Sequence, residues 1–201
     1  LLLGGRYNHA SVKTTDRLKP VLINEEGKAS PGLNNDYTYR RFNPSVGIAY
    51  QTAIHSTWYA SAGTSNRVPT PVELACSDPE FPCLLPNAMA ADPFLEQVIT
   101  TTVEGGYRTR WASGSNQYGF SFNVFRANNK NDILFVTDGA GSGGFFQNYG
   151  KTRRQGVELD FDWDTSVWNF GASYQYLDAT FQSPARLASE GNSSAVDLNG
   201  D

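Results

Sequence analysis

The chain has 201 residues, of which 39% are hydrophobic and 18% are charged. This composition excludes a disordered chain, and the absence of any apolar run of roughly 18 residues excludes a helical membrane protein. A formal net charge of −4, with lysines and arginines scattered along the sequence, excludes the basic surface of a nucleic-acid-binding protein. Abundant glycine (19 residues) and aromatics (13%) favour β structure with almost no helix.

Seven strand-like runs alternate with connections of two very different lengths. The runs cover residues 1–14, 39–51, 56–66, 96–110, 117–136, 145–163 and 167–181. Long polar connections lie at 15–38, 67–95, 137–144 and from 182 onward, and short ones at 52–55, 111–116 and 164–166. Long and short connections strictly alternate. This predicts an up-and-down antiparallel meander whose loops gather at one rim and whose tight turns gather at the other.

The clearest strand lies between residues 157 and 163. Every other residue there is apolar, and every intervening residue is acidic. A period of two predicts a β-strand whose two faces meet different media, one of them oily. The charged residues that we expect on the wet, lumen-facing wall are Glu104, Arg108, Glu158, Asp160 and Asp162.

The neighbouring runs show the same alternation, and their proposed outward positions carry no charge. These positions are Val46, Ile48, Tyr50, Val103, Gly105, Tyr107, Tyr118, Phe120, Phe122, Val124, Trp168, Phe170, Ala172, Tyr174 and Tyr176. The run at 56–66 is compatible with two registers, because either Trp58 or Tyr59 could face outward with the residues that alternate with it.

A soluble β-sandwich would also hide one apolar face and wet the other. Two features favour a membrane barrel instead. Aromatic residues flank the short turns, where they would form a belt at one membrane interface. The runs at 117–136 and 145–163 also exceed the 9–11 residues that a tilted strand needs to cross a bilayer, so they would project beyond it.

Residues with catalytic or metal-binding chemistry are sparse. The two histidines, His9 and His55, lie far apart in the sequence, and no Gly-x-Ser-x-Gly elbow is present. The glycine-rich stretch at 139–144 predicts a flexible loop tip, because no helix follows it to bind a phosphate. We therefore expect no enzymatic activity, no cofactor and no metal site.

The long connections carry the candidates for ligand binding. Aromatic side chains stack on planar ligands and arginine pairs with anionic chelates, so the candidates are Arg67, Phe81, Phe94, Phe145 and Phe146. The alternative is that these phenylalanines pack the loops against one another. Pro69 and Pro71 predict an extended start to the connection at 67–95, because proline restricts φ.

The chain has two cysteines, Cys76 and Cys83, both in the longest connection. A lone pair lacks the further ligands of a zinc site. In an oxidising compartment such a pair predicts a local disulfide, which would stiffen a surface loop.

An ordered series of short blocks resembles the barrel of TonB-dependent outer-membrane receptors. The blocks lie at residues 43–50 (NPSVGIAY), 58–61 (WYAS), 66–74 (NRVPTPVEL), 103–108 (VEGGYR), 125–133, 148–150 (NYG) and 156–158 (GVE). The resemblance implies about seven strands of an antiparallel transmembrane β-barrel of about 22 strands, in the outer membrane of a Gram-negative bacterium.

The resemblance also implies partners. They are outer-membrane lipid, the receptor's own plug domain, the TonB complex acting through an N-terminal region, and a scarce small-molecule ligand such as a ferric siderophore. The ligand would bind at the extracellular loops and be imported to the periplasm by energy-coupled plug movement. Nucleic acid is not among the expected partners.

We expect residues 1–201 to be a partial β-barrel domain that lacks the plug domain and the C-terminal strands. Seven strands leave two unpaired edges and cannot close into a barrel. Two other functions stay open from the residues. A passive porin-like channel would be favoured if the complete protein lacked a plug, and a soluble β-rich binding or adhesion module if the chain folded alone.

Overall fold

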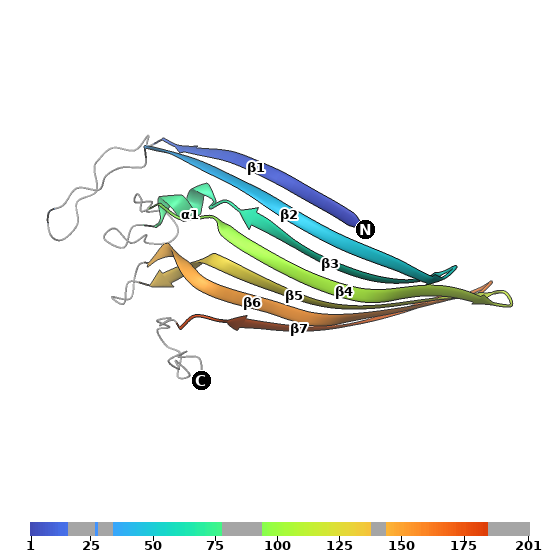
Figure 1. The fold of residues 1–201 in the computed structure, drawn as a ribbon. Helices are drawn as coiled ribbons and strands as arrows, with labels where there is room; N and C mark the ends of the chain where they lie inside the picture. The colour runs from blue at the N-terminus through green and yellow to red at the C-terminus, as the bar shows by residue number, and fades with distance from the viewer. Residues whose placement is uncertain (16–26, 28–33, 78–93, 138–143, 185–201) are drawn as a thin grey trace.

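Seven strands form one antiparallel sheet in which each strand pairs with the next one in the sequence (Figure 1). The computed structural model describes residues 1–15, 27, 34–77, 94–137 and 144–184. The strands are β1 (Leu2–Thr14), β2 (Asn35–Ala53), β3 (Ser56–Arg67), β4 (Val98–Ser113), β5 (Asn116–Thr137), β6 (Gly144–Asp164) and β7 (Asn169–Phe181). This is the predicted up-and-down meander. The sheet is open, because β1 and β7 are its two edges.

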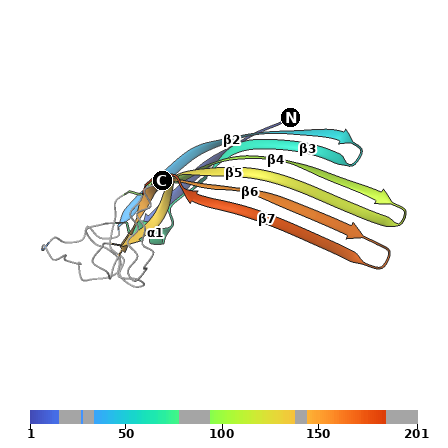
Figure 2. The same ribbon diagram turned by 90° about the horizontal axis from the view of Figure 1, so that it is seen from below.

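The two ends of the sheet differ, as the connection lengths predicted. Figure 2 shows the β2–β3, β4–β5 and β6–β7 turns together at one end, which we call the turn end, and helix α1 at the other, the loop end. The β4–β5 turn is tight enough to need Gly114 at a φ of +61°. At the turn end Tyr118 stacks between Trp111 and Trp163, with ring centroids 5.3 and 6.2 Å away.

Cross-strand pairing assigns each residue to a face, because directly paired residues of antiparallel strands lie on the same side of the sheet. Tyr50 is opposite Trp58, and Trp58 is opposite Tyr107. The register that the sequence left open therefore places Trp58, with Ala60 and Ala62, among the apolar residues. This side, the aromatic face, also carries Val46, Ile48, Val103, Tyr118, Phe120, Phe122, Val124, Val157, Leu159, Phe161, Trp163, Phe170, Tyr174 and Tyr176. The other side is the polar face.

The buried hydrophobic cluster is small and lies at the loop end. Its members are Tyr37, Tyr39, Leu74, Leu95, Val98 and Ile133, with Val12, Val68 and Phe146 packed against them. The large side chains of the aromatic face are mostly exposed or half-buried; Trp168, beside the β6–β7 turn, is 75% exposed. Within the described ranges no helix has the length and apolar character to cross a membrane.

Helix α1 (Pro71–Ala75) interrupts the connection between β3 and β4. Pro71 begins this helix, so the expectation of an extended stretch there was wrong at this residue. The sequence holds the signal for the helix, a capping box. Glu73 N–H donates to Thr70 Oγ1 at 3.3 Å, and Thr70 N–H donates to Glu73 Oε2 at 2.7 Å. The helix buries Leu74 at the centre of the loop-end cluster.

The carboxylate of Glu73 also binds Arg67, at 2.7 Å. Burial alone would raise the pKa of Glu73, but hydrogen bonds from Arg67 and Thr70 outweigh it and hold the pKa below its ordinary value of 4.5. The ionised form is therefore favoured by the folded helix. Its stabilising contribution is present above the ordinary pKa and is lost as the pH falls through the lowered one.

Removing the cap is expected to loosen α1. Thr70→Ala should cost about 1 kcal/mol of local stability, which corresponds to roughly fivefold faster hydrogen exchange at the Leu74 amide, a donor to Thr70 O at 3.0 Å. Glu73→Gln should accelerate the same exchange near neutral pH and less so at pH 3. Thr100→Ala, which removes a hydroxyl from β4, serves as the control. Equal protection of Leu74 in all variants would contradict the capping role.

Candidate functional site

Side chains on the polar face are hydrogen-bonded across neighbouring strands. Ser121 Oγ donates to Asp160 Oδ2 at 2.9 Å. One residue pair further toward the loop end, Glu158 accepts from Asn123 Nδ2 at 3.2 Å and from Gln175 Nε2 at 3.1 Å. These bonds tie the carboxylates of Asp160 and Glu158 to the neighbouring strands, so this part of the polar face is an ordered wall.

Toward the turn end, the charges of this wall are separated by sign. Arg108 and Arg110 lie on β4, and the three carboxylates predicted from the alternation, Glu158, Asp160 and Asp162, lie on β6. Strand β5 separates the two sets by two strand spacings, roughly 10 Å. It contributes Gly119 between Arg110 and Asp162, where an added Cβ would lie 3.3 Å from Asp162 Oδ2. The wall thus offers a basic stripe beside an acidic one.

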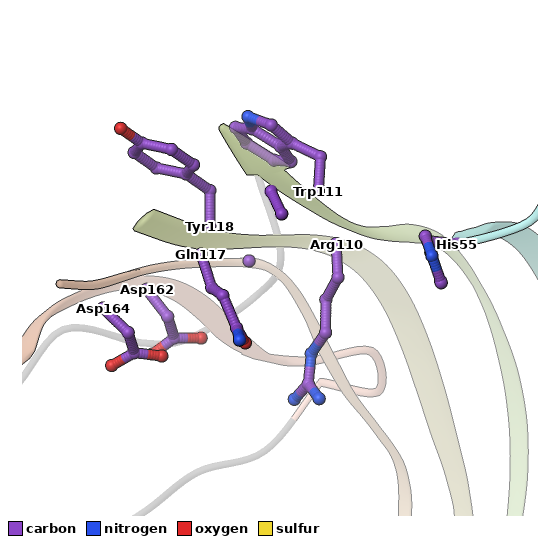
Figure 3. Close-up of a pocket in the computed structure, with 9 residues that line it drawn as sticks. His55, Arg110, Trp111, Gln117, Tyr118, Asp162 and Asp164 are labelled. Atoms are coloured by element: carbon purple, nitrogen blue, oxygen red, sulfur yellow. The ribbon is translucent and has the colours of Figure 1, made fainter. Parts of the chain in front are cut away.

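A shallow hollow lies on this wall at the turn end. Its lining includes Arg110, Gln117 and Asp162, and Figure 3 shows these side chains on the opposite side of the sheet from Trp111 and Tyr118. The hollow is therefore bordered by both positively and negatively charged side chains. No group of three or more histidine, cysteine or acidic side chains that could hold a metal ion occurs in the described part of the chain.

Glu104 belongs to the same polar face as the β6 carboxylates, and it accepts from Ser61 Oγ at 2.8 Å. All five residues assigned from the sequence to a lumen wall therefore share one side of the sheet. Whether this side lines a lumen remains a prediction.

At the loop end, aromatic rings cluster beside α1. Phe94 stacks on Tyr39, with ring centroids 5.6 Å apart and an interplanar angle of 16°, and lies 6.2 Å from the ring of Tyr37. Tyr39 donates its hydroxyl to Leu95 O at 3.0 Å. Tyr37 and Tyr39 are buried, but Phe94 is 60% exposed. The outer surface of Phe94 is therefore an open aromatic platform on a rigid base.

The other candidates for ligand binding differ in their surroundings. Phe146 packs against the buried cluster and makes an edge-on contact with Phe135, with ring centroids 5.1 Å apart. Phe145 is half-buried opposite Val136. Arg67 pairs with Glu73 while its side chain is 46% exposed. The structure brings Arg67 and Phe94 to the same end of the sheet, and a ligand contact of any of them remains a prediction.

Two predicted residues, Phe81 and Cys83, lie outside the described residues. Cys76 is disulfide-bonded. It lies directly after α1, and its backbone carbonyl accepts from the N–H of Phe146 on β6. The segment that carries the cysteine is thereby attached to the sheet. The pairing with Cys83 stays a prediction.

An amide network at the loop end was not anticipated from the sequence. The β2–β3 pairing ends at Ser45 and Gly63, although both strands continue. Beyond that point Asn66 Oδ1 accepts from Asn8 Nδ2 at 2.6 Å and from Asn43 Nδ2 at 2.7 Å. The only available signal was asparagine inside strand-like runs, where this residue is disfavoured.

The comparisons with known proteins agree with this geometry. Residues 1–200 match the family model of the TonB dependent receptor-like β-barrel. The hemophore receptor HasR of Serratia marcescens, solved with its hemophore HasA and heme, is 15% identical with a TM-score of 0.61, over 88% of this chain and 29% of that one. The copper transporter OprC is 23% identical with a TM-score of 0.62, over 88% and 26%.

A third solved structure is the FrpB iron transporter of Neisseria meningitidis, which is 18% identical with a TM-score of 0.54, over 88% of this chain and 23% of that one. At these identities the likeness shows the fold. The chain spans less than a third of the length of each of these proteins. The match over residues 1–200, together with the open antiparallel meander, shows that the chain belongs to the TonB-dependent receptor-like β-barrel family.

Proposed function

We propose that this chain is part of the barrel wall of an outer-membrane receptor, which binds a scarce ligand at its loop end and imports it by energy-coupled movement of a plug domain. The observation that carries the proposal is a sheet with one aromatic face, one charged face and two open edges. Such a sheet needs lipid on one side, water or protein on the other, and further strands to close it.

The aromatic face supports a position in lipid. Apolar side chains are neighbours of one another across this face, as at Ile48, Tyr107, Leu159 and Tyr174. A contiguous apolar area of this kind is unusual on a soluble monomer. The stacked rings of Trp111, Tyr118 and Trp163 lie where an interfacial belt is expected. A soluble module would need a second sheet to cover this face.

The charged wall supports a plugged barrel. A basic stripe on β4 and an acidic stripe on β6 offer a partner ion pairs at fixed positions. A plug domain inside the barrel is the partner that fits. Coupling to the TonB complex would act through a region that precedes this chain.

The loop end supports a planar or chelated ligand. Phe94 is a supported aromatic platform, and Arg67 supplies a positive charge at the same end of the sheet. The similar solved structures are described as a hemophore receptor in complex with its hemophore and heme, a copper transporter and an iron transporter. An iron chelate such as a ferric siderophore combines an aromatic or planar surface with negative charge, and it is the ligand class that we propose for this receptor.

The membrane placement can be tested by a pair of adjacent substitutions on β6 in the full-length receptor. Leu159→Arg puts a charge between Phe122 and Tyr174 on the aromatic face, at a cost of about 2–4 kcal/mol if lipid lies there. Asp160→Arg puts the same side chain on the polar face. We expect Leu159→Arg to abolish the folded, heat-modifiable receptor in outer-membrane fractions and Asp160→Arg to leave it. Equal levels of both variants would contradict the placement.

The ligand site can be tested by comparing Phe94→Ala with Phe42→Ala in the full-length receptor. Both phenylalanines are 60% exposed, but Phe42 pairs with Tyr7 on the other face of the sheet from the buried tyrosines. Loss of one stacking ring should weaken binding of a ferric siderophore roughly five- to tenfold in Phe94→Ala. Phe42→Ala should bind like the wild type. Equal affinities would exclude Phe94 from the binding site.

Energy coupling separates a receptor from a passive channel. Uptake of radiolabelled iron chelate, cobalamin and a glycan should be measured in cells that produce the full-length protein, with and without an uncoupler of the proton gradient. We expect uptake of the iron chelate alone, and its loss on uncoupling. Uptake that persists after uncoupling would indicate a porin-like channel.

A further inference from the structure

Four basic side chains lie together on β5 and β6, on the same side of the sheet as the aromatic face but nearer the loop end. We call them the basic patch: Arg126, Lys130, Lys151 and Arg153. Asn129 and Thr152, the neighbours of Lys130 and Lys151, are bonded to each other on the polar face, at 3.1 Å. The alternation of a strand therefore turns Lys130, Lys151 and Arg153 to the other side.

The basic patch has cross-strand partners that position its charges without neutralising them. Arg126 Nε donates to Gln155 Oε1 at 2.9 Å, and Arg153 Nε donates to Asn128 Oδ1 at 3.0 Å. Lys130 lies directly opposite Lys151. Like charges at directly opposed positions destabilise a sheet, so an anion at this place would relieve a repulsion that is built into the pairing.

The nearby carboxylates bind other groups. Asp178 on β7 accepts from Gln155 Nε2 at 3.0 Å, and Asp132 accepts from Thr152 Oγ1 at 2.6 Å on the polar face. Glu96 accepts from the side-chain amide of Asn131. Among the described residues, the basic patch therefore keeps an excess of positive charge.

The distance along the strand places the basic patch at the edge of a membrane. An apolar band about 25 Å tall, crossed by a strand tilted by about 40°, takes about ten residues. Counted from the interfacial ring of Tyr118, ten residues along β5 lead to Asn128, which is opposite Arg153. Arg126 would reach up from just inside the band, and the two lysines would lie just above it, at the level of lipid headgroups.

An apolar hollow adjoins the basic patch on the side toward the turn end. It lies over Gly105, which has no side chain to fill it, and its lining includes Val103, Val124, Val157 and Tyr176, with Arg126 at its border. Apolar walls beside a cluster of cations fit a molecule with acyl chains and an anionic head.

We propose that the basic patch and this hollow bind a phosphate-bearing lipid of the outer leaflet, with an acyl chain over Gly105 and the phosphate held by Arg126, Arg153 and the lysine pair. This inference rests on the proposed placement in the outer membrane. It adds a lateral lipid site, on the opposite face of the sheet from the charged wall, that fixes the height and rotation of this part of the barrel in the bilayer.

The test uses the full-length receptor in nanodiscs made of equal parts phosphatidylglycerol and phosphatidylcholine, with native mass spectrometry of the lipids that remain bound. The double variant Lys151→Gln/Arg153→Gln removes two charges from the basic patch. Arg154→Gln is the matched control, because Arg154 is the next residue on the same strand and is exposed on the polar face. Each surface cation contributes about fivefold to the affinity for anionic lipid.

We expect the wild type and Arg154→Gln to retain phosphatidylglycerol preferentially, and the double variant to lose this preference by roughly 25-fold. Inorganic phosphate at millimolar concentration should not displace the lipid. Retention of phosphatidylglycerol by the double variant, an equal loss in Arg154→Gln, or displacement by phosphate alone would overturn the proposal. Failure of the wild-type receptor to insert into nanodiscs would instead overturn the proposed membrane placement.

Discussion

The continuous ladder of backbone hydrogen bonds from β1 to β7 is the interaction on which the rest of this structure depends. A soluble sheet gains most of its stability by burying one face against another layer. Here that layer is missing from the described residues, and the buried cluster at the loop end is small. The strands are therefore held mainly by hydrogen bonds to neighbouring strands. Burial of the aromatic face, which a second layer would otherwise provide, must come from the surrounding medium. In lipid, this arrangement is obligatory, since an unpaired backbone amide costs several kcal/mol there.

The ladder determines how the side chains divide between two media. Paired residues share a face, so Tyr50, Trp58 and Tyr107, which are opposite one another on β2, β3 and β4, lie on the same side of the sheet. The charged residues that alternate with the apolar ones on β4 and β6 therefore lie on the other side. Nothing else is needed to separate aromatic from charged residues over the whole sheet. The exception near the loop end is informative. Arg126 and Lys130 continue the aromatic face of β5 within the same strand. Under the proposed membrane placement, this change from apolar to basic residues coincides with the edge of the bilayer and not with an edge of the sheet.

Much of this fold could be predicted from the sequence, because strand period and turn spacing are local signals. The alternation around Asp160 assigned the faces of β6, and the spacing of the turns gave the strand order. The register of β3 could not be derived from the sequence, because small residues such as Ala60 and Ser61 are compatible with either face. The pairing of Trp58 with Tyr50 on β2 decides it. Helix α1 was missed although Thr70 and Glu73 carry its signal, since five residues give no hydrophobic period.

The candidate site was predicted less completely, and the reason is physical. The contact of Phe94 with Tyr39 joins segments 55 residues apart in the sequence, and no local pattern encodes it. The acidic stripe was visible along one strand. Its position relative to the arginines of β4 depends on the pairing of both strands with β5, which places Gly119 between Arg110 and Asp162.

The place where the ladder between β2 and β3 stops divides the sheet into two parts that respond differently to substitution. Past Ser45 and Gly63, β2 and β3 are joined through side chains, with Asn66 accepting from Asn8 and Asn43. Backbone pairing tolerates almost any side chain, but such a network depends on each of its members. Substitutions at the loop end can therefore reshape the proposed binding surface while the sheet below keeps its register. The solved structures that are 15–23% identical to this chain keep the same fold over 88% of it, which is what a sheet held by backbone pairing predicts.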